Sequence, residues 1–296
     1  MIRVKRIAHA SFETPDIERQ VAYYTGILGL TLAARDRDTV YLSCGRGEPA
    51  VILRRGAHAT CTRLAFQVAP ETDMGEFARQ ITGHGISVQR QSDSAPSIGD
   101  MVTFEDPKGT RIDVFREQQP LQSWKSAEAG IAPYKLGHVA FNCIDVKKIT
   151  NFYCEVLGFR VSDWFADFFS FLRCGPDHHT INLLDSKTIK LNHMAFEVRD
   201  WSHLETACDF LSRHDIPLIW GPGRHGPGHN LFAYHKNPDG QIVELFAELD
   251  RMNDETLGYF EPRPWHRDHP QKPKVWPKDI KYANLWGIPP PHEMLE

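Results

Sequence analysis

Three residues in the second half of the chain have the types and spacing of a metal site. His138 and His193 lie near the start of two alternating apolar runs, and Glu244 lies in a third run, QIVELF. Two neutral imidazoles and one carboxylate suit non-haem Fe(II) and leave coordination positions open. The alternative is three buried polar residues that satisfy one another by hydrogen bonds. Because a buried glutamate needs a partner and the two histidines hold corresponding strand positions, we favour the metal.

The three residues belong to a unit that occurs twice in the chain. The offset between the copies is 129 residues for the first segment, 130 for the second and 131 for the third. Three segments in the same order indicate a tandem duplication of about 130 residues. The matching segments are 9–30 with 138–159, 62–68 with 192–198, and 103–115 with 234–246.

Each half is predicted to be α+β, with the order β-α-β-β-β twice. In the second half, GHVAFNC alternates like a strand, and Asp145 precedes a helix that is expected to end at Gly158. A second helix, 201–213, is expected after Asp200. We expect its inward face to consist of Trp201, Leu204, Cys208 and Leu211. Two such modules that pair their sheets into a half-open barrel would turn His138, His193 and Glu244 inward.

Length and composition frame the domain organisation. The 296 residues suggest two domains. We expect a non-catalytic amino-terminal domain over 1–118, a linker over 119–135, a catalytic domain over 136–250 and a tail over 251–296. The tail is rich in proline and tryptophan, and its aromatic content predicts that it packs on the body or covers the mouth of a site. Its aromatic residues are Tyr259, Phe260, Trp265, Trp276, Tyr282 and Trp286.

Charge and cysteine content narrow the partners and the compartment. The net charge of −4 argues against a nucleic-acid binder, and no apolar run is long enough to span a membrane. The amino terminus lacks the apolar stretch of a signal peptide. The six cysteines form no CxxC pair, so we expect reduced thiols and a cytoplasmic protein.

The first half does not repeat the metal-binding residue types. The positions that match His138, His193 and Glu244 there are His9, Arg63 and Asp113. An arginine cannot lose its proton to bind a metal. An ion pair between Arg63 and Asp113 would fill the same space, so we expect the first half to be structural.

Further histidines and one tyrosine surround the predicted ligands in the second half. His178 and His179 begin a strand, and a Gly/Pro-rich loop with the segment after it holds His225, His229, Tyr234 and His235. Tyr234 lies on the strand before Glu244, across a tight turn, so the two side chains could approach one another. Taken singly, each of these residues could equally be a surface histidine or a core tyrosine.

The chain resembles the type I extradiol ring-cleavage dioxygenases of the vicinal-oxygen-chelate superfamily, over roughly residues 3 to 250. The segments GHVAFN, LNHMAFEV and NPDGQIVELF resemble the three ligand motifs of that family. The resemblance implies tandem domains of two βαβββ modules each, with the metal ligands His138, His193 and Glu244 in the second. It also implies active-site roles for His179, His225 and Tyr234. The segment GPGH after His225 departs from the commoner family spelling.

What the resemblance implies about activity is extradiol cleavage of a substituted catechol. The cofactor would be Fe(II), with Mn(II) as the alternative, because both accept this ligand set. Insertion of O2 would give a muconic semialdehyde-type product in aromatic-compound degradation. Tyr234 and His225 would contact the catechol oxygens, and His179 would stabilise charge on the oxygen side. The family also suggests a homo-oligomer.

Two other functions fit the same fold. A glyoxalase-like isomerase or lyase typically uses a fourth protein ligand, and a non-catalytic small-molecule binder generally lacks the metal-binding residues. The pocket walls are expected from an aromatic run, from the next strand and from the tail. The expected wall residues are Trp164, Phe165, Phe168, Phe169, Phe171, Ile181 and Leu183.

Overall fold

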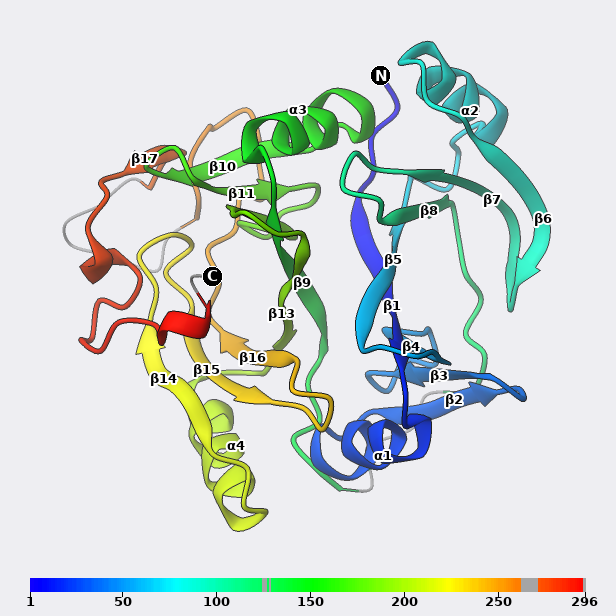
Figure 1. Cartoon of the computed structure of the whole chain (residues 1–296). Coiled ribbons are helices and arrows are strands. Elements are labelled where there is room, and N and C mark those ends of the chain that lie inside the picture. The colour runs from blue at the N-terminus through cyan, green and yellow to red at the C-terminus, as the bar shows by residue number, and fades with distance from the viewer. Residues whose placement is uncertain (124–126, 128, 262–270, 295–296) are drawn as a thin grey trace. The chain divides into compact units, whose positions relative to one another are not determined.

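A computed structural model describes residues 1–123, 127, 129–261 and 271–294. The described chain forms two compact units (Figure 1). The first comprises Met1–Leu136 with two short segments, Glu155–Gly158 and Asn237–Gln241. The second comprises Gly137–Cys154, Phe159–Lys236 and Ile242–Glu296. Residues 124–126 and 128 of the predicted linker, and 262–270 and 295–296 of the predicted tail, lie outside the described residues.

The first unit contains two modules of the predicted order β-α-β-β-β. Its eight strands form one sheet in the order β2-β3-β4-β1-β5-β8-β7-β6. The elements of the first module are β1 (Arg6–Thr14), α1 (Ile17–Ala22), the π-helix η1 (Tyr23–Ile27), β2 (Thr31–Arg35), β3 (Thr39–Ser43) and β4 (Val51–Arg55). Those of the second are β5 (Thr60–Gln67), α2 (Met74–Gly83), β6 (Gln89–Ala95), β7 (Ile98–Glu105) and β8 (Arg111–Phe115).

The second unit repeats this order, so the predicted α+β fold of paired modules is confirmed. The elements of its first module are β9 (Lys135–Cys143), α3 (Val146–Leu157), β10 (Arg160–Phe165), β11 (Phe169–Arg173) and β12 (Ile181–Asp185). Those of its second are β13 (Lys190–Glu197), α4 (Trp201–Arg213), β14 (Leu218–Arg224), β15 (Leu231–Lys236) and β16 (Ile242–Ala247). The tail adds β17 (Lys274–Trp276) and two 3-10 turns, η2 (Ile280–Tyr282) and η3 (His292–Met294).

The sheet of the second unit brings the strands of the predicted ligands together. Its order is β14-β15-β16-β13-β9-β12-β11-β10-β17, so β16, β13 and β9 are consecutive neighbours. Figure 1 shows this sheet bent into an open U, with β10 and β11 on one arm and β14 and β15 on the other. Side chains on the inner face of the three central strands therefore point into the same space.

Local sequence explains the two helices of this unit. The Asp145 carboxylate accepts a hydrogen bond from the Lys148 backbone N–H at 3.1 Å, and α3 stops before Gly158, whose φ is +75°. Asp200 caps α4 through the His203 N–H at 2.9 Å.

The predicted inward face of α4 is wrong at Trp201. This side chain is 39% exposed and its ring lies against Trp286 of the tail. The reason is that the buried stripe starts one turn later and consists of Leu204, Ala207 and Leu211. Cys208, also expected inside, is half-buried.

The tail adds an edge to the sheet of the second unit. Strand β17 pairs in parallel with β10, which places Trp276 opposite Phe165. The Asp163 carboxylate accepts hydrogen bonds from the Lys274 backbone N–H at 2.9 Å and from the Trp276 ring N–H at 2.6 Å. These contacts attach the tail to the arm that carries the aromatic run.

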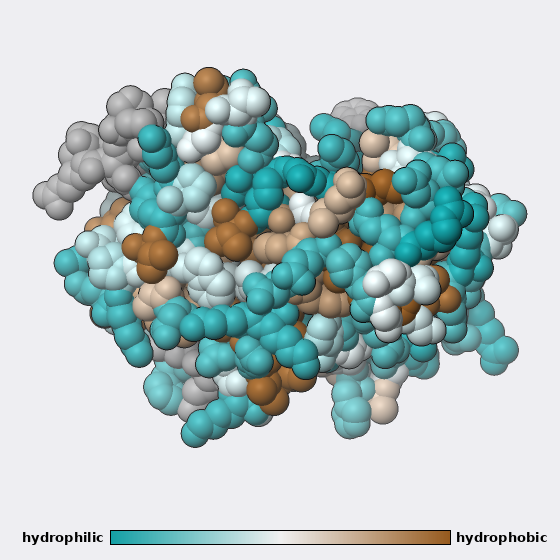
Figure 2. Space-filling view, turned by 90° about the horizontal axis from the view of Figure 1, so that it is seen from above, coloured by the Kyte–Doolittle hydropathy of each residue, from teal (hydrophilic) through white to brown (hydrophobic). Residues whose placement is uncertain are grey.

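Figure 2 shows a face on which hydrophilic residues predominate and hydrophobic residues are scattered. Within the described residues, none of the helices is both long and apolar enough to cross a membrane.

Candidate active site

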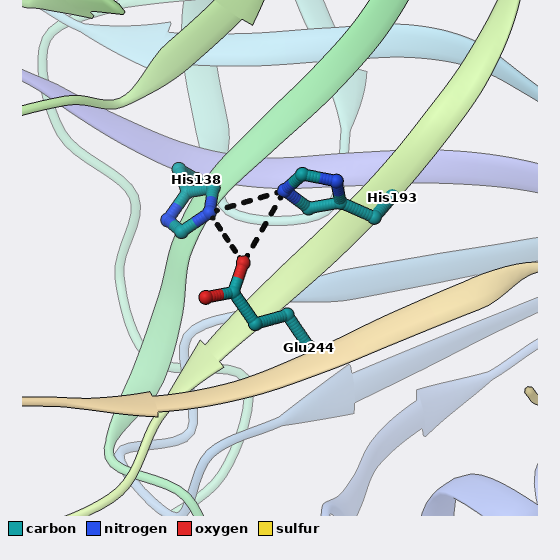
Figure 3. Close-up of side chains that lie close together, drawn as sticks. All are labelled: His138, His193 and Glu244. Carbon is teal, nitrogen blue, oxygen red and sulfur yellow. Dashed lines mark hydrogen bonds and ion pairs between the residues drawn. The ribbon is translucent and has the colours of Figure 1, made fainter. Parts of the chain in front are cut away.

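Three adjacent strands carry the predicted metal ligands, one from each. His138 lies on β9, His193 on β13 and Glu244 on β16, and Figure 3 shows the three side chains converging. All three are buried, with 1%, 5% and 1% of their surface exposed. Among the described residues, this is the one group of three histidine, cysteine or acidic side chains whose ligand atoms lie close enough to hold a metal ion.

The ligand atoms form a nearly equilateral triangle. His138 Nε2 lies 3.0 Å from Glu244 Oε2 and 3.3 Å from His193 Nε2, and the third edge, from His193 Nε2 to Glu244 Oε2, is 3.3 Å. Ligand atoms about 2.1 Å from an octahedral metal lie about 3 Å apart. The triangle therefore has the size of one face of such a coordination sphere.

Electrostatics favour the protonation states that a metal needs. Burial lowers the pKa of His138, which keeps its imidazole neutral. Burial alone would raise the pKa of Glu244, but its close contacts with His138 and His193 outweigh burial and hold that pKa well below its usual range. Three acceptor atoms that face one another are unfavourable unless a cation lies among them, and a divalent metal satisfies all three. The side chains thus fit a metal ion.

Neighbouring groups orient the ligands. The His193 Nδ1–H donates to Asn192 Oδ1 at 2.7 Å, and Asn230 Nδ2 donates to Glu244 Oε1 at 3.0 Å. The His138 ring packs on Phe246, with 5.0 Å between ring centroids. Gly137 allows this contact, because a Cβ there would lie 2.3 Å from a Phe246 ring atom.

The structure places the other three predicted site residues around this triangle. The His225 ring follows β14, and its Nε2 lies 3.0 Å from the Tyr234 hydroxyl and 3.8 Å from Glu244 Oε1. Tyr234 on β15 is paired directly with Glu244 on β16. The His179 ring precedes β12 and lies edge-on to His138, with 4.4 Å between centroids. All six residues line one pocket.

These three residues are uncharged in the folded protein near neutral pH. Burial lowers the pKa of His225 to about 4 and lowers that of His179 well below its usual value. Burial also raises the pKa of Tyr234, and the Glu244 charge raises it further. The site therefore offers two neutral imidazoles and one phenol beside the metal ligands.

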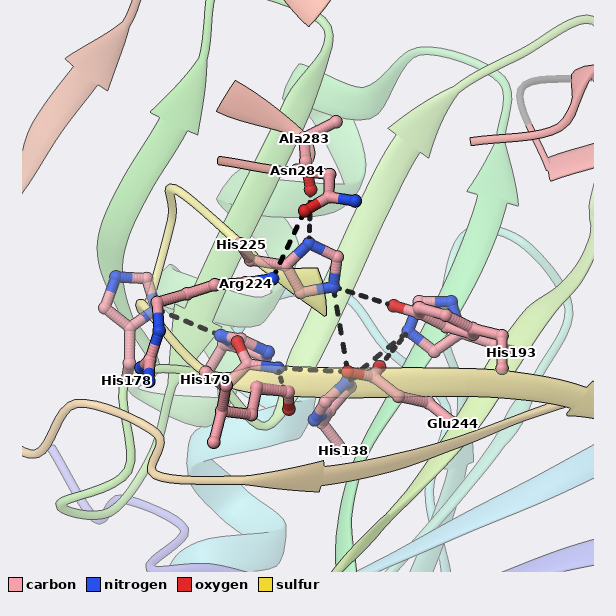
Figure 4. A network of polar contacts seen from close by, with 12 residues as sticks. His138, His178, His179, His193, Arg224, His225, Glu244, Ala283 and Asn284 are labelled. Atoms are coloured by element: carbon pink, nitrogen blue, oxygen red, sulfur yellow. Dashed lines mark hydrogen bonds and ion pairs between the residues drawn. The ribbon is translucent and has the colours of Figure 1, made fainter. Parts of the chain in front are cut away.

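His178 and His229 lie behind the pocket rather than in its lining. His178 Nδ1 lies 3.0 Å from His179 Nδ1, and its Nε2 lies 3.2 Å from Asp163 Oδ2 (Figure 4 shows the two histidines). His229 Nδ1 lies 2.7 Å from Asp250 Oδ2. The sequence alone did not separate these histidines from those of the site.

Beyond the six site residues the pocket lining is apolar except for two asparagines, and the pocket holds about 780 Å³ of empty space including its mouth. Trp164, Ile181 and Leu183 were expected in the wall but are not part of it. Ile181 and Leu183 point to the opposite face of β12, because side chains alternate along a strand. The walls are Phe165, Phe168, Phe169, Phe171, Asn182, Leu184, Asn192, Trp220, Pro227, Ile280, Ala283, Pro290 and Met294.

Sequence reasoning missed two asparagines of this lining. Asn192 precedes His193 and hydrogen-bonds its ring. Asn182 lies on β12 between Ile181 and Leu183 and lines the pocket in place of these two residues. The available signal for Asn192 was a polar residue next to a predicted ligand in a strand whose remaining side chains are mostly apolar.

Comparisons with known proteins show which family the chain resembles. The family model described as Glyoxalase/Bleomycin resistance protein/Dioxygenase superfamily matches residues 6–114 and 135–245. The manganese-dependent 2,3-dihydroxybiphenyl 1,2-dioxygenase of Geobacillus genomosp. 3 is 24% identical, over 92% of this chain and 93% of its own length. Metapyrocatechase 2 of Cupriavidus necator is 26% identical, over 83% of this chain and 82% of its own.

A solved structure covers the whole chain. The Mn(II)-bound glyoxalase from Novosphingobium aromaticivorans superposes with a TM-score of 0.87 at 25% identity, over 100% of this chain and 95% of that one. The fold is thus the tandem arrangement expected from the sequence. Because the family model matches both halves and most of the residues, the chain belongs to the Glyoxalase/Bleomycin resistance protein/Dioxygenase superfamily.

Proposed function

We propose that this protein cleaves the ring of a substituted catechol next to its hydroxyl groups, using O2. The observation that carries the proposal is the buried triangle of His138, His193 and Glu244 in the lining of a mostly apolar pocket, with His179, His225 and Tyr234 in the same lining. The related dioxygenases of Geobacillus and Cupriavidus support the same reaction.

The residues of the site have distinct tasks in this proposal. His138, His193 and Glu244 would hold Fe(II) or Mn(II), which when bound supplies open coordination positions and electron transfer between catechol and dioxygen. The ligand set accepts either metal, and one relative is named as manganese-dependent.

His225 and Tyr234 would handle a catechol proton. The His225 Nδ1–H donates to the Ala283 carbonyl at 2.6 Å, so in the neutral ring Nε2 carries a lone pair. The Tyr234 O–H donates to that lone pair at 3.0 Å. A substrate hydroxyl that displaced this contact would meet a neutral base, and the phenol could hydrogen-bond the oxygen that remains.

His179 would act beside the ligand His138. Its imidazole is neutral and lies edge-on to His138. A neutral imidazole next to the reacting oxygen can stabilise developing negative charge and exchange a proton with it.

We also propose that the catechol carries an uncharged, apolar substituent. Among the described lining residues, Glu244 is the sole one with a formal charge, and four phenylalanines form one wall. Three lysines lie over rings of the aromatic cluster to which this wall belongs, but none of them lines the pocket: Lys274 over Trp276, Lys278 over Phe168 and Lys281 over Tyr282. A substrate carboxylate in this wall would be desolvated without a partner.

The test is a panel of catechols with anaerobically loaded Fe(II) or Mn(II) enzyme. We expect equal consumption of catechol and O2 and a yellow product, with kcat/KM about tenfold higher for 4-ethylcatechol than for 3,4-dihydroxyphenylacetate. If no catechol consumes oxygen while the metal stays bound, the reaction is wrong. If the carboxylated compound is the better substrate, only the substituent is wrong.

One observation favours a second candidate. The structure with a TM-score of 0.87 is named a glyoxalase. Isomerisation of the methylglyoxal–glutathione hemithioacetal by the Mn(II)-loaded protein, without oxygen uptake, would favour that function. The homo-oligomer expected from the sequence stays a prediction, which light scattering tests.

A further inference from the structure

Backbone carbonyls of the tail accept hydrogen bonds from side chains around the pocket. We call residues 271–294 the tail strap. Its Ala283 carbonyl accepts from His225 Nδ1 (Figure 4), and its Ile288 carbonyl accepts from the Trp220 ring N–H at 2.8 Å. Its Met294 carbonyl accepts from Asn192 Nδ2 at 3.0 Å. The strap therefore holds donors beside the site in addition to lining part of the pocket.

The contact at Asn192 determines which way its amide points. Asn192 Nδ2 donates to two acceptors, Asn142 Oδ1 at 2.7 Å and the Met294 carbonyl. An amide group has both donors on its nitrogen, so two acceptors on one side fix the nitrogen there. The Asn192 oxygen must then face the other way, toward His193 Nδ1 at 2.7 Å.

The orientation of this amide in turn determines the tautomer of His193. An amide oxygen accepts only, so the His193 proton must lie on Nδ1 and the lone pair on Nε2. Nε2 is the atom that faces His138 Nε2 and Glu244 Oε2. If the amide turned over, its nitrogen would donate to Nδ1 and the proton would move to Nε2, which would block metal binding.

We propose that Asn192 is a positioning residue for the metal ligand His193, and that the Met294 carbonyl of the tail strap keeps its amide in the productive orientation. The strap thus contributes to metal affinity through a backbone atom that is not itself a ligand. Partners of this kind are typically worth about 10- to 100-fold in metal affinity. The proposal rests on the metal site proposed above but not on the reaction.

The first experiment measures the equilibrium affinity for Mn(II) by electron paramagnetic resonance, without any substrate. Asn192→Ala is expected to weaken binding about 10- to 100-fold. A chain that ends at Pro291 lacks the Met294 carbonyl and is expected to weaken it about tenfold. Asn253→Ala, at an exposed asparagine bonded to Glu261, is the matched control and should leave the affinity unchanged.

Two further controls separate the carbonyl from the rest of the deleted segment. Met294→Ala removes a pocket-lining side chain but keeps the carbonyl, so Mn(II) affinity should stay at the wild-type level. Glu293→Gln removes the exposed ion pair with Lys236 and should also leave it unchanged. If Met294→Ala weakens binding as much as the deletion does, the side chain is responsible and the proposal is overturned.

A double-variant cycle tests whether the strap acts through Asn192. In the Asn192→Ala background, the deletion after Pro291 should cause almost no further loss of Mn(II) affinity, because the two changes break one pathway. Additive losses would overturn the coupling. Wild-type protein that binds no Mn(II) would instead refute the metal site itself.

A second measurement does not depend on metal binding. Long-range ¹H–¹⁵N spectra of the metal-free protein report which ring nitrogen carries the proton. We expect His193 to be protonated on Nδ1 in the wild type and in Met294→Ala, and to be a mixture of tautomers in Asn192→Ala. A pure Nδ1–H form in Asn192→Ala, with circular dichroism showing a native fold, would contradict the proposal.

Discussion

The two units carry different chemistry at corresponding strand positions of their two sheets. In the second, His193 and Glu244 face His138 at 3.0 to 3.3 Å. In the first, Arg63 Nη1 contacts both Asp113 oxygens at 2.7 and 2.8 Å, and Thr103 Oγ1 donates to Asp113 Oδ1 at 2.7 Å. The guanidinium supplies inside the protein the positive charge that a metal would supply in the second unit.

His9 shows what the shared histidine becomes without metal-binding partners. It is 5% exposed, its ring stacks on Phe115, and its Nδ1 has no hydrogen-bond partner among the described residues. Burial lowers its pKa to about 4. The same strand position therefore serves packing in one unit and ligation in the other, and the neighbouring side chains decide which.

The largest effect is expected when His193 in the second unit is replaced by arginine, the residue at the corresponding position of the first unit. His193→Arg replaces a metal ligand by a permanent cation, so we expect more than about 100-fold loss of metal affinity, beyond what loss of an outer partner costs. Metal content per folded chain measures it. The matched control is Arg63→Lys, which should leave metal content unchanged. Wild-type metal content in His193→Arg would refute the ligand assignment.

A smaller effect, on turnover rather than on metal binding, is expected at His225. His225→Gln keeps a hydrogen-bonding side chain but removes the neutral base, so kcat should fall about 100-fold while bound metal is retained. Oxygen uptake on 4-ethylcatechol measures kcat. His9→Gln in the first unit should leave it unchanged. Wild-type turnover in His225→Gln would remove that residue from the proposed proton transfer.

In the first unit the expected effect is on stability. Asp113→Asn leaves the Arg63 charge without its partner, and because Arg63 is about one-fifth exposed we reduce the cost of breaking a buried pair to about 2 kcal/mol. Urea unfolding measures it. Mn(II) affinity should not change. Loss of metal in Asp113→Asn would show that the first unit is not merely structural.

The smallest predicted effect is a pH dependence that His9 causes. Its folded pKa of about 4 lies below the ordinary histidine pKa of 6.5, so the unfolded chain binds the proton more tightly. Stability should therefore fall as the pH drops from 6.5 toward 4, and the His9 share at pH 5.5 is about 1 kcal/mol. Urea midpoints from pH 7 to 5.5 measure it, and His9→Gln should flatten the curve. An unchanged curve would contradict the burial effect.

Much of this arrangement could be predicted because side chains alternate between the two faces of a strand and because the sequence contains an internal repeat. The repeat placed His138, His193 and Glu244 on comparable strands, and the modules and helix caps followed from local patterns. The wall at Ile181 and Leu183 was assigned to the wrong face, since a shift of one residue along a strand reverses every side chain. The contacts of Met294 and Ala283 involve backbone carbonyls, which no side-chain pattern reveals.

The distribution of the ligands over the two modules has a mechanical consequence. His138 comes from the first module of its unit, whereas His193 and Glu244 come from the second, and the modules meet where β9 pairs with β13. A metal held by all three residues would therefore link the two modules across the boundary between β9 and β13. In the first unit, Arg63 and Asp113 both belong to the second module, so their ion pair does not link the two modules. Bound metal would thus stabilise the contact between the two modules of the second unit, but not the contact between the modules of the first. The order in which the two units unfold with heat or denaturant should therefore depend on metal.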